Sequence, residues 1–128
     1  MTTKTKKKYQ IEIEVKTSPR ILYSYISTPN GLSDWFADDV TIQNGVYTFK
    51  WGDDEQKAKM VHHRDQKMVH FKWVDDPEDT FFEIEIVVDD MTRDTALLVT
   101  DFAEPDEIEE NSMIWEKQVD NLKHKLGV

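Results

Sequence analysis

The segment VTIQNGVYTFKW, residues 40–51, decides the fold that this sequence predicts. Asn44-Gly45 separates two runs of alternating apolar residues, and this dipeptide favours a two-residue type I′ turn because both turn positions need a positive φ. Such a turn fixes the register of an antiparallel hairpin and gives its two strands one common apolar face. That face consists of Val40, Ile42, Tyr47, Phe49 and Trp51.

Alternating apolar residues continue in both directions from this hairpin. They predict a strand at 9–15, a second hairpin at 56–64 with 67–74, and a third strand pair at 80–88 with 94–102. The second hairpin has one predicted inward face, made of Ala58, Met60, His62, Val69, Phe71 and Trp73. The last strand leaves two alternatives open, an inward face of Leu97, Val99 and Asp101 or one of Ala96, Leu98 and Phe102.

Two short helices are predicted after the first strand. Ser18-Pro19 is typical of a helix start, since a hydroxyl side chain caps the free N–H groups and proline suits the first turn. Pro29-Asn30-Gly31 ends this helix. A second short helix is expected to carry Leu32, Trp35 and Phe36.

A long amphipathic helix is predicted at the C-terminus. Asp106 and Glu109 have the spacing of a capping box, and Gly127 is a plausible stop. Between them runs one apolar stripe, formed by Ile108, Trp115, Val119, Leu122 and Leu126. Antiparallel strands with an apolar face need a cover, and this helix is long enough to cross them. The fold class is therefore α+β.

Composition restricts the classes of function. The 128 residues fit a single domain, 1–128, with residues 1–8 as a flexible basic leader. The net charge of −10 disfavours binding to nucleic acid or to an anionic membrane surface. The absence of cysteine excludes disulfides and thiolate sites. No signal peptide or membrane-spanning stretch is evident, so a cytoplasmic location and no membrane insertion are expected.

The ordered series of elements resembles the START-like helix-grip superfamily, also called SRPBCC. Within it, the chain is similar to the C-terminal domain of the Aha-type activator of a heat-shock chaperone ATPase. The resemblance rests on the strand at 9–15, the Ser18-Pro19 helix entry, the Pro-x-x-Leu-x-x-Trp-Phe stretch from Pro29 to Phe36, the hairpin series and the closing helix. It implies a curved sheet of about seven antiparallel strands wrapped around the C-terminal helix, with a cavity between them. It also implies that Leu97, Val99 and Asp101 face inward.

The inward aromatic residues, together with a few polar anchors, are the candidate ligand-binding set. Small-molecule sites are mostly apolar with a small number of polar groups, which matches this set. Trp35 and Phe36 lie near the stretch that resembles the cavity entrance of the family. The full candidate set is Trp35, Phe36, Tyr47, Phe49, Trp51, Met60, His62, Phe71, Trp73, Asp101 and Trp115.

The polar residues offer few candidates for catalysis or metal binding. His63 and His70 share the predicted outer face of the second hairpin, but two imidazoles without a third ligand do not predict a zinc site. The acidic clusters at 34–39 and 53–55 lack the spacing of a calcium loop and are expected to be solvated. His62 and Asp101 are the residues on which catalysis would depend. No metal and no cofactor is predicted.

The leading hypothesis is a protein that binds an apolar or amphipathic, lipid-like small molecule between sheet and helix. The alternatives are a protein-interaction module, acting on a chaperone or as a homodimer, and a cavity enzyme using His62 or Asp101. Binding is favoured over interaction, and interaction over catalysis.

Overall fold

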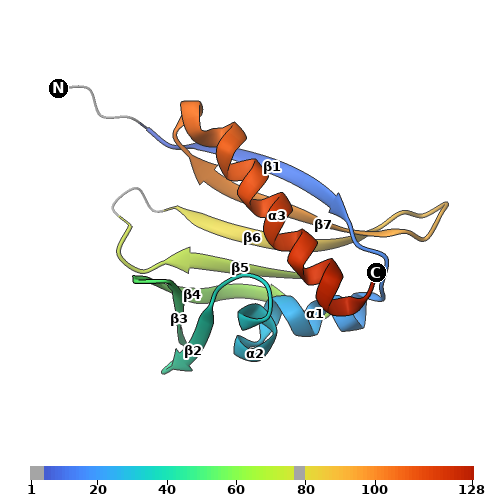
Figure 1. Cartoon of the computed structure of the whole chain (residues 1–128), viewed down its shortest axis with the longest axis horizontal. Helices are drawn as coiled ribbons and strands as arrows, with labels where there is room; N and C mark the ends of the chain where they lie inside the picture. Colours follow the sequence, from blue (N-terminus) through green and yellow to red (C-terminus); the bar gives the residue numbers. More distant parts are fainter. Residues whose placement is uncertain (1–4, 77–79) are drawn as a thin grey trace.

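The computed structural model describes residues 5–76 and 80–128, and within these ranges seven strands form one antiparallel sheet that a long helix crosses (Figure 1). The strand order is β1-β7-β6-β5-β4-β3-β2. The strands are β1 Lys7–Glu14, β2 Asp39–Gln43, β3 Val46–Trp51, β4 Asp54–Arg64, β5 Met68–Trp73, β6 Phe81–Val88 and β7 Thr95–Ala103. The helices are α1 Pro19–Ser27, α2 Pro29–Ser33, the short 3₁₀ helix η1 Pro105–Glu107 and α3 Ile108–Leu126. The predicted α+β helix-grip architecture is confirmed.

The hairpin of β2 and β3 has the register that its sequence predicts. Asn44 and Gly45 have φ angles of 53° and 79°, as a type I′ turn requires. Ile42 pairs with Tyr47 and Val40 with Phe49. The β2 strand lies at an edge of the sheet, however, so Ile42 stays 48% exposed while Tyr47 and Phe49 of β3 are buried.

The first strand begins earlier than its apolar alternation suggests. Lys7 and Lys8, expected in the flexible leader, pair with Ala103 and Phe102 of β7. Backbone hydrogen bonds need no particular side chain, so lysines extend the strand without an apolar signal. Residues 1–4 of the predicted leader lie outside the described residues.

The second hairpin contains a β-bulge that the sequence analysis missed. Met60 pairs with Phe71, but the next pair is His62 with His70, so Val61 is an extra residue in β4. One extra residue reverses the alternation of side chains beyond it. The prediction that His62 faces inward is therefore wrong. His62 is exposed on the outer face, and His63 instead stands opposite the buried Val69.

The two short helices are each capped by a hydroxyl side chain. Ser18 Oγ accepts a hydrogen bond from the Ile21 backbone N–H at 3.3 Å, which confirms the predicted start of α1. The second cap is Thr28, whose Oγ1 accepts from the Gly31 N–H at 3.0 Å. Helix α2 then ends at Ser33, so the prediction that it carries Trp35 and Phe36 is wrong. These two residues lie in the turn between α2 and β2.

The C-terminal helix has the predicted stripe and stop but a different start. Pro105–Glu107 form the 3₁₀ turn η1, and Glu107, at the N-cap of α3, makes no side-chain capping bond. The predicted capping box at Asp106 is therefore wrong. Gly127 ends α3 with a φ of 74°. Trp115, Val119 and Leu122 are buried. No helix in the described ranges is long and apolar enough to cross a membrane.

The ambiguity in the last strand is resolved in favour of Leu97, Val99 and Asp101 as the inward set. Leu97 and Val99 are fully buried, and Asp101 bonds to α3. Ala96 and Thr100 on the opposite face are also buried, because β7 lies between β1 and β6. Burial on both faces removes the alternation that a sequence pattern needs.

A close contact between α1 and α2 supports a prediction about stability. A Cβ added at Gly31 would lie 2.2 Å from the Ser24 carbonyl oxygen and 2.6 Å from Tyr25 Cα. Because both obstacles are backbone atoms, Gly31→Ala should lower the free energy of unfolding by about 3 kcal/mol in urea denaturation. The control is Gly45→Asn, where a Cβ meets nothing within 4 Å and asparagine tolerates the positive φ. Equal losses in both variants would contradict the prediction.

Candidate functional site

The space between α3 and the sheet is filled by aromatic side chains rather than left as a cavity. Phe36 lies at its centre, 4% exposed. Its ring centroid is 5.2 to 5.7 Å from five other aromatic rings, those of Trp35, Phe49, Trp51, Phe82 and Trp115. The Phe36 backbone carbonyl also accepts hydrogen bonds from Trp51 Nε1 at 2.7 Å and Gln118 Nε2 at 2.9 Å. The turn after α2 is thereby fixed to both β3 and α3.

Six of the eleven candidate residues line neither of the two hollows described below. Phe49 and Phe71 are fully buried in the core. Trp35 Nε1 donates to the Tyr25 carbonyl at 2.8 Å, and Tyr47 Oη donates to the Ser27 carbonyl at 3.0 Å, so both side chains tie the core to α1. The other two are Met60, partly buried against the core, and His62, exposed on the outer face.

The remaining five candidates line an open cleft of about 400 Å³ at one end of the core. We call it the tryptophan cleft. Its ten lining residues are Phe36, Trp51, Asp54, Gln56, Trp73, Asp101, Asn111, Ile114, Trp115 and Gln118. It lies between β3, β4 and β5 on one side and the N-terminal half of α3 on the other, with Asp101 contributed by β7.

Sequence reasoning missed five lining residues: four are polar and lay outside its search for apolar side chains, and Ile114 lies outside the predicted apolar stripe of the helix. On β4, Asp54 and Gln56 continue the inward alternation of Ala58 and Met60 toward the strand start, as polar residues. On α3, the missed residues Asn111, Ile114 and Gln118 accompany Trp115 with spacings of three and four, so they share one side of the helix. The available signal was the position of polar residues in line with an apolar strand face or helix stripe, which indicates where a buried face opens to a cleft.

Asp101 is the polar anchor of the cleft. Its Oδ2 accepts hydrogen bonds from Trp115 Nε1 at 2.8 Å and Tyr9 Oη at 3.3 Å, and its Oδ1 accepts from the Phe102 N–H at 2.8 Å. Burial raises the pKa of Asp101, while these bonds and the charge of Lys6 act in the opposite direction. Burial and the Asp101 charge together raise the pKa of Tyr9.

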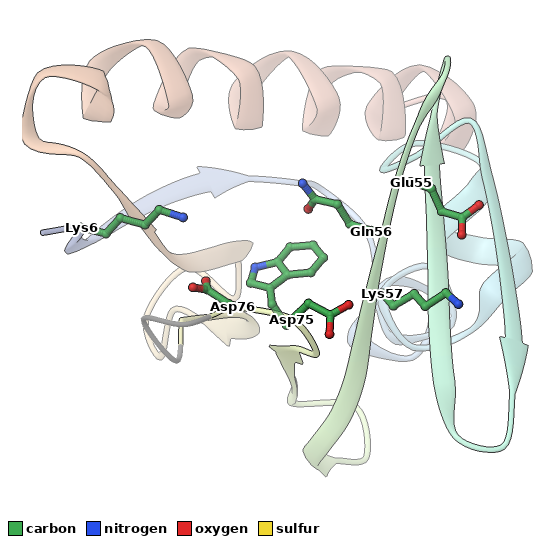
Figure 2. A pocket seen from close by; sticks show the side chains of 7 residues that line it. Lys6, Glu55, Gln56, Lys57, Asp75 and Asp76 are labelled. Carbon is green, nitrogen blue, oxygen red and sulfur yellow. The ribbon is translucent and has the colours of Figure 1, made fainter. Parts of the chain in front are cut away.

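A second, more polar hollow adjoins the tryptophan cleft and shares Gln56 and Trp73 with it. We call it the polar hollow. Its volume is about 500 Å³, and its lining residues are Lys6, Glu55, Gln56, Lys57, Trp73, Asp75 and Asp76. Figure 2 shows Lys6 and Gln56 extending into it from opposite sides, whereas Glu55 and Lys57 project from the other side of β4. We call the lining residues of the two hollows together the rim.

The histidines do not contribute to this rim. The bulge places His63 and His70 on opposite faces of the sheet, so the shared outer face expected for them is wrong. His70 Nδ1 lies 3.0 Å from Glu83 Oε1, and its ring stacks on Phe81. His63 Nδ1 lies 3.5 Å from Tyr23 Oη.

One acidic group in the described part of the chain has carboxylate oxygens close enough together to hold a cation. It consists of Glu104, Asp106 and Glu107, around η1, and the last two are exposed. A side-chain hydrogen bond with Glu104 and the negative charge of Glu104 both raise the pKa of Glu107. Exposed carboxylates of this kind are common without a metal, and none of the three lines the tryptophan cleft.

The raised pKa of Asp101 leads to a prediction about pH. A carboxyl group that binds its proton more tightly in the folded state contributes stability below its usual pKa of 3.8, and this contribution is lost as the pH rises through the folded-state value. Wild-type protein should therefore lose stability relative to Asp101→Asn as the pH rises above about 4. Urea unfolding at several pH values measures this difference. A constant difference, or one of opposite sign, would contradict the prediction.

The fold is shared with several solved structures. The solution structure of the Aha1 dimer from Colwellia psychrerythraea matches with a TM-score of 0.77 and 19% identity, over 91% of this chain and 93% of that one. DynU16, from the dynemicin biosynthetic locus, matches with a TM-score of 0.76 and 16% identity. The match covers 94% of this chain and 47% of DynU16. SSP2350 from Staphylococcus saprophyticus matches with a TM-score of 0.74 and 12% identity, over 94% of this chain and 92% of that one.

A comparison with curated protein sequences gave no match. A family model described as the START-like superfamily domain, in contrast, matches residues 2–128. The observed sheet order and closing helix agree with the helix-grip fold that the sequence resemblance implied. Since the model spans nearly the whole chain, the protein belongs to the START-like superfamily.

Proposed function

We propose that this protein binds a small amphipathic molecule in the tryptophan cleft. The observation that carries the proposal is the position of Trp51, Trp73 and Trp115 around one opening of about 400 Å³. Trp51 and Trp73 are only partly buried although they belong to the inward face of the sheet. Ligand sites combine such aromatic walls with a few fixed polar groups, and Asp101 is held by three hydrogen bonds beside them.

The packed interior restricts the size of the ligand. Phe49, Phe71 and Phe82 are fully buried, so a large apolar ligand could enter the core only by displacing well-packed rings. The proposed ligand therefore occupies the end of the core, with an apolar part against the indoles and a polar part toward solvent. This is a narrower proposal than a lipid-filled cavity between sheet and helix.

The four tryptophans provide a direct binding test with an internal control. In ¹H–¹⁵N NMR spectra, octan-1-ol, 2-naphthol, octanoate and octyltrimethylammonium can each be titrated against the indole signals, assigned with single Trp→Phe variants. Binding should shift the signals of Trp51, Trp73 and Trp115. The Trp35 signal should stay in place, since Trp35 does not line the cleft and is 4% exposed. If none of the probes shifts the three cleft signals, the proposal is wrong.

A surface substitution on α3 tests the position of the site. Ile114 is 50% exposed and lines the cleft, whereas the neighbouring Met113 is 63% exposed and does not. Ile114→Ser should weaken binding of the probe that shifts the cleft signals by about fivefold, because about 1 kcal/mol of apolar contact is lost. Met113→Ser should leave the affinity unchanged. Equal effects of the two substitutions would place the ligand elsewhere.

A second candidate function is that of a protein-interaction module. It is favoured by the likeness to the Aha1 dimer structure over nearly the full length of both chains. It is also favoured by the sheet edges β1 and β2, which pair with no further strand in the described ranges. Light scattering over a range of concentrations would detect a dimer, and a heat-shock chaperone ATPase assay would detect activation. A monomer without effect on the ATPase would eliminate this candidate.

A further inference from the structure

The charges around the tryptophan cleft indicate what kind of polar group its ligand carries. The ten lining residues include two carboxylates, Asp54 and Asp101, and none of them is a lysine, arginine or histidine. The adjoining polar hollow adds Glu55, Asp75 and Asp76 against two lysines. Because Glu55 and Lys57 project from the other side of β4 (Figure 2), the remaining charged residues of the rim are four carboxylates, Asp54, Asp75, Asp76 and Asp101, and one ammonium group, Lys6.

We propose that the ligand of the tryptophan cleft is a small organic cation with an apolar body, such as an alkylammonium. This inference rests on the proposed binding function and specifies its ligand class. The faces of tryptophan rings attract cations through their quadrupole, most strongly where water is excluded. Trp51, Trp73 and Trp115 line the same opening as Asp54 and Asp101.

The environment of Asp101 argues against a neutral or anionic ligand. Its three hydrogen-bond donors come from Trp115, Tyr9 and the Phe102 backbone, and all of them are neutral groups. A neutral amphiphile lying over this carboxylate would remove its remaining contact with water without compensation, and an anion would add repulsion. A cation offsets the lost hydration energy of the carboxylate through electrostatic attraction. Lys6 already favours the ionised form of Asp101 through its charge, so a positive charge at this end of the core suits the site.

The same residues do not suit a metal ion. Ca²⁺ takes six to eight oxygen ligands, largely from carboxylates and carbonyl groups, and Mg²⁺ takes six, several of which are usually waters. Most of the wall of the tryptophan cleft is aromatic or apolar, and Asp54 and Asp101 belong to separate strands, β4 and β7. An organic cation keeps no tight hydration shell and can use the indole faces directly.

Three probes of equal chain length test the inference: octyltrimethylammonium, octan-1-ol and octanoate. Dissociation constants come from the indole shifts of Trp51, Trp73 and Trp115 in full-length protein. We expect the ammonium to bind about tenfold more tightly than the alcohol, and octanoate to bind most weakly. Raising the salt concentration should weaken ammonium binding and leave alcohol binding unchanged.

A matched pair of substitutions in the β3–β4 hairpin identifies the charge involved. Asp54 lines the cleft, and the neighbouring Asp53 is exposed and does not. Asp54→Asn should weaken ammonium binding about threefold without changing alcohol binding, whereas Asp53→Asn should change neither. Alcohol binding as tight as ammonium binding would overturn the cation inference while leaving the proposed function intact. Absence of cleft shifts with every probe would overturn both.

Discussion

The structure depends on the position of Phe36. Its ring fills the space where α3 passes over the sheet, and its carbonyl joins Trp51 of β3 to Gln118 of α3 through two hydrogen bonds. Protein interiors are packed to the density of organic crystals, so a ring at this point excludes a ligand from the same volume. The sheet and the long helix therefore enclose a packed aromatic core, and the tryptophan cleft lies beside it.

Trp115 marks the boundary between that core and the open cleft. Its ring stacks on Phe36 at 5.3 Å, while its Nε1 donates to Asp101. On one side of it, Val119 and Leu122 continue the buried stripe of α3. On the other, Asn111 and Ile114 turn to the cleft. Helix α3 thus packs on the core with its apolar stripe and lines the cleft with the mixed side chains of its N-terminal half.

The predictable parts of this fold are those in which a local signal fixes the geometry. Asn44-Gly45 determines its hairpin register because a two-residue turn permits one pairing. Val61 leaves no such signal: a β-branched residue suits a regular strand as well as a bulge, so His62 was assigned to the wrong face. The aromatic candidates were recognised as inward, but their division between core and cleft depends on how Phe36 packs, which is a property of the assembled molecule.

A packed core also shapes how this cleft could select a ligand. A hollow of about 400 Å³ buries little apolar area, so affinity from hydrophobic contact alone would be modest. Its polar groups, in contrast, are held in place: Asp101 by Trp115 and Tyr9, and Trp51 by the Phe36 carbonyl. Preorganised charges discriminate between ligands because a wrong partner leaves a buried group uncompensated. For a ligand in a site this small, we therefore expect charge to matter more for selection than the length of the apolar chain.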